Sequence, residues 1–155
     1  MSSERTHVLL DLDGTISDSA PGIGRSLRHA FEECGYEPPT DEQIRSVIGP
    51  PFEVGLPSLG VRIDDLERVV AAYGDRYRDV GLFENTVYPG IAVLLDELTA
   101  AGHTRSIATA KPDPTARRII EPFGLSPYVE GLAGASVAGG GGRRTKAQGR
   151  AYALI

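Results

Sequence analysis

Cysteine is nearly absent from this sequence, which has Cys34 alone among its 155 residues. A single cysteine excludes a disulfide bond within the chain and a metal site built from several cysteines. Such a low cysteine content is typical of proteins in a reducing compartment. We therefore expect a cytoplasmic protein in which Cys34 has a packing role.

Long apolar runs and an excess of positive charge are missing as well. No apolar run approaches the ~20 residues of a membrane-spanning helix, and the N-terminal stretch MSSERTHVLL lacks the long apolar region of a secretory signal. The formal net charge is −5, so anionic surfaces would repel the chain at long range. We expect neither a membrane nor a nucleic acid as partner, and a small-molecule substrate fits better.

The order of apolar patterns predicts an α/β protein with a helical insertion. The 155 residues, 41% of them hydrophobic, suffice for one ordinary core. Strand-like runs occupy residues 7–12, 104–110 and 128–136. Helical periodicity occupies residues 21–34, 40–49, 64–81, 91–98, 114–121 and 145–155. Thr40 and Gln43 form a capping-box pattern, whereas the proline-containing stretch 49–60 is expected to break the helix. The glycine run at 137–142 is predicted to be flexible.

Two aspartates follow the first predicted strand, in the stretch LLDLDGTISDS. Alternation along a strand points Asp11 and Asp13 the same way, and ligands of parallel α/β sheets sit beyond the carboxyl ends of the strands. Thr109 ends the next predicted strand and falls at the same edge. The simpler interpretation is an Asp-Gly turn followed by helix-capping residues, and for the bare motif the two interpretations are about equally weighted.

Paired carboxylates at such an edge suit phosphoryl transfer. Their mutual repulsion raises one pKa or recruits a cation, and ligands that are all oxygen favour Mg²⁺. One carboxylate can then attack phosphorus while the other exchanges a proton with the leaving group. Gly14 permits close approach of the backbone, and nearby N–H groups with a threonine hydroxyl can hold phosphate oxygens.

Several separated stretches resemble one family. DLDGTISDS, IRSVIGPPF and IATAKP are similar to motifs of the haloacid dehalogenase superfamily, in particular its capped phosphatases of the phosphoglycolate phosphatase and 5′-nucleotidase-like branch. The resemblance covers nearly the whole chain. It implies a Rossmann-like core of residues 1–19 and 89–155, with a parallel sheet lacking its C-terminal strands, and an inserted α-helical cap of residues 20–88.

The resemblance also implies roles for individual residues. Asp11 is expected to be the nucleophile that forms an aspartyl-phosphate, and Asp13 the acid that protonates the leaving alcohol. Thr109 is expected to hydrogen-bond the transferring phosphoryl group. Lys146 matches the lysine that balances its charge, and Lys111 is the competing candidate because it is closer to Thr109 in sequence.

Further expectations concern the ligands of this site. Mg²⁺ is the implied cofactor, held by Asp11 and by the backbone carbonyl of Asp13. Gly14 and Lys111 are assigned to phosphate binding, and Arg45 of the cap is expected to contact an anion of the substrate. The implied reaction is hydrolysis of a small phosphorylated metabolite, and the chain leaves the identity of that metabolite open.

The sequence departs from the family at its C-terminal end. The fourth family motif, which completes the metal site, has no counterpart, and no aspartate follows Asp113. We therefore expect low or no activity from this chain. A non-catalytic binding module and a β-phosphoglucomutase-like phosphomutase remain as alternatives. The first strand would lie at an exposed sheet edge, where self-association is expected.

Overall fold

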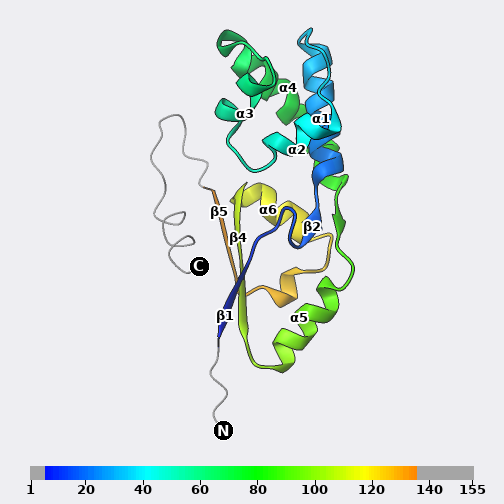
Figure 1. Ribbon diagram of the computed structural model, residues 1–155. Coiled ribbons are helices and arrows are strands. Elements are labelled where there is room, and N and C mark those ends of the chain that lie inside the picture. Colours follow the sequence, from blue (N-terminus) through cyan, green and yellow to red (C-terminus); the bar gives the residue numbers. More distant parts are fainter. Residues whose placement is uncertain (1–5, 136–155) are drawn as a thin grey trace. The chain divides into compact units, whose positions relative to one another are not determined.

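A computed structural model describes residues 6–135 of the chain (Figure 1). The chain divides into two compact units, the first formed by residues 1–17 and 87–155 and the second by residues 18–86. Each division falls two residues before the boundary expected from the sequence. The predicted helix at 145–155 and the glycine run at 137–142 lie outside the described residues. Within residues 6–135, no helix has the length and apolar character needed to cross a membrane.

A three-stranded parallel sheet forms the centre of the first unit. Its strands are β1 (His7–Leu10), β4 (Thr104–Pro112) and β5 (Gly131–Ala135), in that order across the sheet. In register, His7 lies opposite Thr104 and Leu10 opposite Ile107. A parallel sheet connected through helices is the α/β class predicted from the sequence, which the structure confirms.

Two helices flank β4 in the chain, one before it and one after it. They are α5 (Ile91–Ala100) and α6 (Asp113–Ile120), with a short 3-10 turn, η3 (Ser126–Tyr128). Helix α6 packs against β4 and β5. The core of this unit is made of aliphatic side chains from these elements, including the fully buried Leu95, Ile107 and Ala116. Burial of such side chains is the main favourable term that holds the sheet and helices together.

Two local predictions differ from the structure. The strand expected to end at residue 110 continues to Pro112, because its pairing with β5 is irregular between Ala108 and Pro112 and a terminal proline needs no ladder hydrogen bond. The predicted break of the helix before residues 49–60 is confirmed, since α2 (Asp41–Val47) ends at Val47, but a separate short helix that the sequence did not predict, α3 (Phe52–Ser58), forms within that stretch with Pro57 inside it. Tertiary packing outweighs the proline, because Leu56 is fully buried.

The second unit is helical, as predicted for this segment. Its elements are α1 (Ala20–Glu33), α2 (Asp41–Val47), α3, η1 (Ile63–Asp65), α4 (Leu66–Asp79) and η2 (Gly81–Phe83). The predicted capping box is confirmed: the Gln43 N–H donates to Thr40 Oγ1 at 3.3 Å, and the Thr40 N–H donates to Gln43 Oε1 at 2.8 Å. Two two-residue strands, β2 (Ser17–Asp18) and β3 (Thr86–Val87), pair where the chain passes between the units, and the sequence did not predict them.

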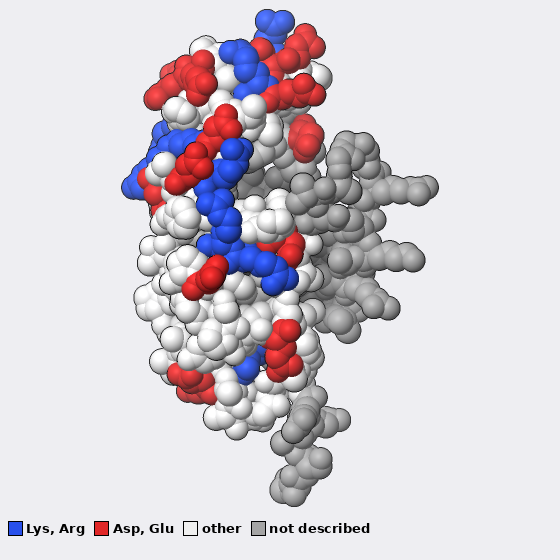
Figure 2. All heavy atoms as spheres, turned by 180° about the vertical axis from the view of Figure 1, so that it is seen from behind, with Lys and Arg blue, Asp and Glu red and all other residues white. Residues whose placement is uncertain are grey.

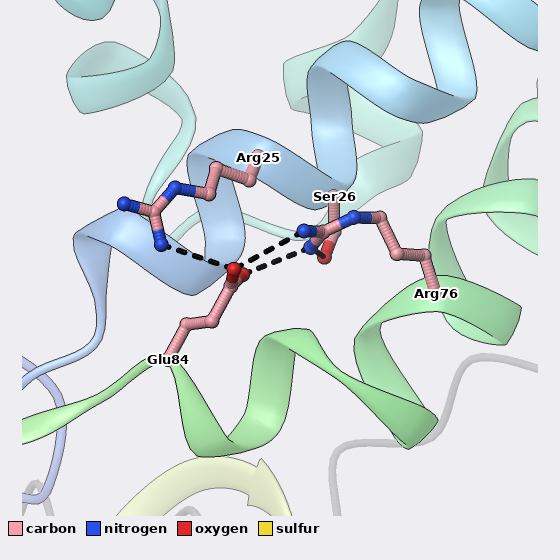
Figure 3. Close-up of polar contacts among 4 residues, drawn as sticks. All are labelled: Arg25, Ser26, Arg76 and Glu84. Carbon is pink, nitrogen blue, oxygen red and sulfur yellow. Dashed lines mark hydrogen bonds and ion pairs between the residues drawn. The ribbon is translucent and has the colours of Figure 1, made fainter.

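Glu84 connects three parts of the second unit through two arginines (Figure 3). Arg76 of α4 donates to both carboxylate oxygens, at 2.9 and 3.2 Å, and Arg25 of α1 donates to Oε1 at 3.0 Å. Arg76 also donates to the buried Ser26 Oγ at 3.0 Å. The Arg76 hydrogen bonds lower the pKa of Glu84, and Arg25 acts in the same direction. This carboxylate therefore fixes the segment after η2 against α1 and α4.

Glu84→Gln is expected to lower the free energy of unfolding at pH 7 by about 2 kcal/mol, because Arg76 loses a charged partner in a site that is only 21% exposed. A carboxyl whose pKa is lowered on folding adds stability above its unfolded pKa, and this stability is lost as the pH falls through the folded pKa. The gap between the two proteins should therefore narrow below about pH 4. Urea unfolding at pH 7 and pH 3.5 measures both effects.

The matched control for this prediction is Asp75→Asn. Asp75 also pairs with an arginine, Arg78, at 3.2 Å, but both side chains are exposed. Exposed pairs contribute about 0–1 kcal/mol, so this variant should unfold almost as the parent does. Equal losses in the two variants would contradict the structural role assigned to Glu84.

Charges of both signs lie close together on the surface. Figure 2 shows acidic side chains next to basic ones on the face behind that of Figure 1. Exposed pairs among the described residues include Arg28 with Asp41 at 2.6 Å and Arg117 with Asp113 at 3.0 Å. Much of the surface charge is thus balanced by a neighbour of opposite sign.

Candidate active site

The candidate site lies in the first unit, at the carboxyl ends of β1 and β4. Asp11 directly follows β1, and Asp13 lies in the loop that comes next. Thr109 and Lys111 belong to the last part of β4. Because β1 and β4 are parallel neighbours, their carboxyl ends lie at the same edge of the sheet.

The shortest contact of the site joins Lys111 to Asp13. The Lys111 Nζ donates to Asp13 Oδ2 at 2.6 Å, and the two side chains are only 11% and 21% exposed. The other oxygen, Asp13 Oδ1, is buried and accepts no hydrogen bond from the described residues. The sequence predicted Lys111 as a phosphate-binding residue and as the rival of Lys146, but it did not predict the pair with Asp13, which depends on the pairing of β1 with β4.

Asp11 has a different environment. Its Oδ1 accepts the Leu12 N–H at 2.7 Å, and the residue is exposed overall. Partial burial of its carboxyl raises the pKa of Asp11, and the charge of Asp13 raises it further. The Leu12 hydrogen bond and the charge of Lys111 lower this pKa but do not cancel the rise. Asp11 is thus an accessible carboxylate close to a second carboxylate and a lysine.

The loop after β1 is a tight turn, as its Asp-Gly sequence predicts. Ile16 and Ser17 donate their N–H groups to Leu12 O at 3.1 and 3.0 Å, and Gly14 donates its N–H to Ser17 O at 2.8 Å. Gly14 has φ +78°, which favours glycine, and a Cβ there would have no atom within 4 Å. The Gly14 N–H is already used in the turn. Gly14 therefore gives a ligand room to approach the backbone but offers it no free N–H donor. The N–H groups of Asp13 and Thr15 take no part in these turn hydrogen bonds.

Thr109 orients the end of β4. Its Oγ1 accepts the N–H of Lys111 at 3.2 Å, which fixes the two residues relative to each other. Gly134 of β5 also supports this segment, because a Cβ there would lie 2.7 Å from Lys111 O and 2.6 Å from Asp113 N. Sequence reasoning missed Gly134, which is one of 19 glycines and carries no distinguishing local signal.

Two predicted site residues are not part of this group. Arg45 lies in α2 of the second unit, where its side chain is exposed. Lys146 lies outside the described residues. The structure therefore brings together Asp11, Asp13, Thr109 and Lys111, all within one unit.

The donor atoms of the site suit a hard cation. Asp11 and Asp13 provide only oxygen ligands, and Mg²⁺ is commonly held by one or two carboxylates together with water and substrate phosphate. Asp11 is exposed, so its carboxylate can contact such a cation. Within residues 6–135 no group of three or more histidine, cysteine, aspartate or glutamate side chains is arranged to hold a metal.

Asp11→Asn is expected to raise the free energy of unfolding at pH 7 in buffer containing a chelator. A carboxyl whose pKa is raised on folding costs stability once the pH exceeds that pKa, and an amide removes this cost. The gain should shrink as the pH falls below the raised pKa and should be small at pH 3.5, where the carboxyl is mostly protonated in both states. Urea unfolding at pH 7 and pH 3.5 measures it.

Asp41→Asn is the control of opposite sign. The hydrogen bond and charge of Arg28 lower the pKa of Asp41, so its replacement should reduce stability at pH 7. A loss of stability at pH 7 on Asp11→Asn would contradict the electrostatic description of the site.

The sequence model described as haloacid dehalogenase-like hydrolase matches residues 8–138. With the fold and the site residues above, this match shows that the chain belongs to the haloacid dehalogenase-like hydrolase family. The resemblance inferred from the separated motifs is thereby confirmed.

The proteins similar to this chain include enzymes named for reactions of phosphate groups. The tyrosine-protein kinase PtkA of Mycobacterium tuberculosis is 38% identical over 148 residues, which cover 96% of this chain and 50% of the relative. Its solved structure matches with a TM-score of 0.83 at 36% identity, covering 99% of this chain and 70% of that one. The 5′-nucleotidase of Pseudomonas aeruginosa is 34% identical over 134 residues, covering 86% of this chain and 61% of the relative.

A solved structure from a third organism is also similar to this chain. A haloacid dehalogenase-like family protein from Streptococcus pneumoniae matches with a TM-score of 0.81 at 31% identity, covering 88% of this chain and 64% of that one. The chain spans about half the length of the mycobacterial relatives that it matches.

Proposed function

We propose that this chain carries the part of a phosphatase active site that transfers the phosphoryl group. The proposed substrate is a small phosphomonoester. The observation that carries the proposal is the convergence of two carboxylates and Lys111 at one sheet edge, with Lys111 Nζ at 2.6 Å from Asp13. Membership of the hydrolase family and the similarity to a 5′-nucleotidase support it.

In the proposed reaction Asp11 is the nucleophile. An oxygen of its carboxylate attacks phosphorus, the bond from phosphorus to the leaving oxygen breaks, and Asp13 gives that oxygen its proton. Water then attacks the phosphorus of the aspartyl-phosphate and Asp13 takes the water proton. Inorganic phosphate leaves and the Asp11 carboxylate is restored.

Lys111 has two partners in this proposal. Without substrate it pairs with Asp13, which holds that side chain in place. A phosphate dianion arriving between Asp11 and Lys111 offers the ammonium a stronger partner, and Asp13 is then released to carry a proton. Charge stabilisation of this kind supplies most of the catalysis in phosphoryl transfer.

Other groups of the same unit complete the phosphate site. The N–H groups of Asp13 and Thr15, which the turn does not use, and the Thr109 side chain are suited to bind phosphate oxygens. Asp11 and the backbone carbonyl of Asp13 would hold Mg²⁺, which supplies charge neutralisation at phosphorus when bound. Arg45 of the helical unit is the proposed contact to a further anionic group of the substrate.

The experiment is hydrolysis of 4-nitrophenyl phosphate with Mg²⁺, using the 155-residue chain and a version extended by the sequence that follows the matched region in the Pseudomonas relative. The extended protein should turn over the ester and the shorter chain should be much slower, because the fourth motif is absent. Failure of both proteins would overturn the enzymatic proposal.

The mycobacterial relative supports a second candidate function, transfer of phosphate to tyrosine. Its name is that of a tyrosine-protein kinase, and its similarity extends over 96% of this chain. Incubation with ATP and Mg²⁺ followed by mass spectrometry distinguishes the two. Phosphotyrosine would favour the kinase reaction, whereas release of inorganic phosphate alone favours hydrolysis.

A further inference from the structure

Strand β4 contains a bulge near its carboxyl end. Ala108 pairs with Ala133, and the next pair is Pro112 with Ala135. Over this interval β4 advances by four residues while β5 advances by two. Because a strand rises about 3.3 Å per residue, about 7 Å of β4 chain is surplus here. The surplus, residues 109–111, must leave the line of the ladder, as the extra residues of a β-bulge do.

The main chain of this bulge is held at both ends. Thr109 Oγ1 accepts the Lys111 N–H at 3.2 Å, which turns the chain within three residues. Pro112 follows with φ −53°, and α6 begins at the next residue. The Lys111 backbone therefore has a defined position, from which Nζ reaches Asp13 Oδ2 at 2.6 Å.

Gly134 is the residue of β5 that lies against the bulge. A Cβ on Gly134 would lie 2.7 Å from Lys111 O and 2.6 Å from both the N and the Cα of Asp113. All three are main-chain atoms, which cannot rotate away as the end of a side chain can. Glycine within a strand is typical of a place where another backbone approaches this closely. A side chain at position 134 would therefore push away the main chain that carries Lys111.

We propose that the bulge, packed against Gly134, positions Lys111 at the active site, which makes Gly134 a positioning residue. Without the bulge, Ala110 would pair with Ala135 and Lys111 would lie beyond that pair along the sheet. The bulge keeps the lysine beside Asp13 instead. Its importance for phosphoryl transfer rests on the proposed function, whereas the position of Lys111 can be tested without turnover.

Acetylation of the 155-residue chain tests the position of Lys111. The sequence contains two lysines, Lys111 and Lys146, so mass spectrometry follows each of them separately, and the Lys146 rate corrects for the reagent. Lys111 is paired and only 11% exposed, so it should react slowly in the parent. Gly134→Ala should raise its rate at least about fivefold, because the displaced main chain draws the ammonium away from Asp13.

Gly131→Ala is the matched control on the same strand. A Cβ on Gly131 would lie 2.9 Å from Ser106 Oγ, and the other atom within 4 Å is Ser106 Cβ. A serine hydroxyl can rotate to another rotamer, so no main chain has to move. The Lys111 rate should stay within about twofold of the parent. Circular dichroism establishes whether both glycine variants are folded.

Thr109→Val tests the same bulge without a steric clash. Valine has nearly the shape of threonine but cannot accept the Lys111 N–H, so the turn is loosened and Lys111 should be acetylated at least about twofold faster. Thr109→Ser keeps the acceptor and should react as the parent does. This pair of variants decides the result if Gly134→Ala does not fold.

Kinetics of the extended protein connect the bulge with the reaction. Gly134→Ala should lower kcat/KM for 4-nitrophenyl phosphate at least about tenfold. In a Lys111→Met background the same change should cost less than about threefold, because both substitutions act on one ammonium and their effects do not add. A role in stability alone would give equal losses in the two backgrounds.

Two results would contradict the proposal. The first is an unchanged Lys111 acetylation rate in Thr109→Val and in folded Gly134→Ala, which would mean that the bulge does not position the lysine. The second is an equal kinetic loss with and without Lys111. An extended parent protein without turnover would instead count against the proposed function, and the acetylation rates would still decide whether the bulge positions Lys111.

Discussion

Asp11→Asn is expected to lower the rate of aryl phosphate hydrolysis by at least about 10³-fold, which corresponds to about 4 kcal/mol of activation free energy. The amide retains the size of the side chain and can still accept the Leu12 N–H, which lies 2.7 Å from Oδ1. It cannot form an acyl phosphate, so the covalent step is lost while the local structure is kept. The rate is measured with 4-nitrophenyl phosphate and Mg²⁺ on the extended and the 155-residue proteins.

Asp75→Asn is the control for this prediction. Asp75 is an exposed aspartate of α4 whose arginine partner lies on the same helix. Its replacement should leave the rate within about twofold of the parent. A rate that survives Asp11→Asn would place the nucleophile elsewhere. Binding of a phosphate ester that survives Asp11→Asn, in a protein without turnover, would instead support the binding-module alternative.

Lys111→Met is expected to lower kcat/KM for the same ester by about 10²- to 10³-fold, because a preorganised positive charge beside the phosphoryl group is lost. Methionine fills most of the volume of the aliphatic stem, which is largely buried with the rest of the side chain. The loss should be larger than that caused by Lys146→Met, since Lys111 is the lysine in contact with Asp13. Steady-state kinetics of both variants in the extended protein measures the difference.

Lys111→Arg is the matched variant for the charge. Arginine keeps a cation at this position but differs in shape, so it should recover part of the loss. Thermal unfolding must show that the methionine variant is folded at the assay temperature. A larger effect of Lys146→Met would mean that Lys146 balances the phosphoryl charge and that Lys111 only holds Asp13 in place.

Much of the helical structure could be predicted from local sequence. The apolar positions of α1, α4, α5 and α6 recur at helical spacing, and the capping box at Thr40 is a local pattern that formed as predicted. Helix α3 could not be predicted, because Pro57 inside it opposes it locally and the burial of Leu56 decides the outcome. The extension of β4 to Pro112 likewise depends on pairing with β5.

The sequence by itself determined the class of this protein and the identity of its carboxylates. The apolar run before Asp11, the Asp-Gly turn and the separated family motifs are local signals, and local signals can be interpreted without coordinates. Only the tertiary structure showed that Lys111 lies beside Asp13, because the two residues are 98 positions apart and meet only through the pairing of β1 with β4. Contacts between distant parts of a chain depend on strand register and burial, which periodicity and spacing do not encode.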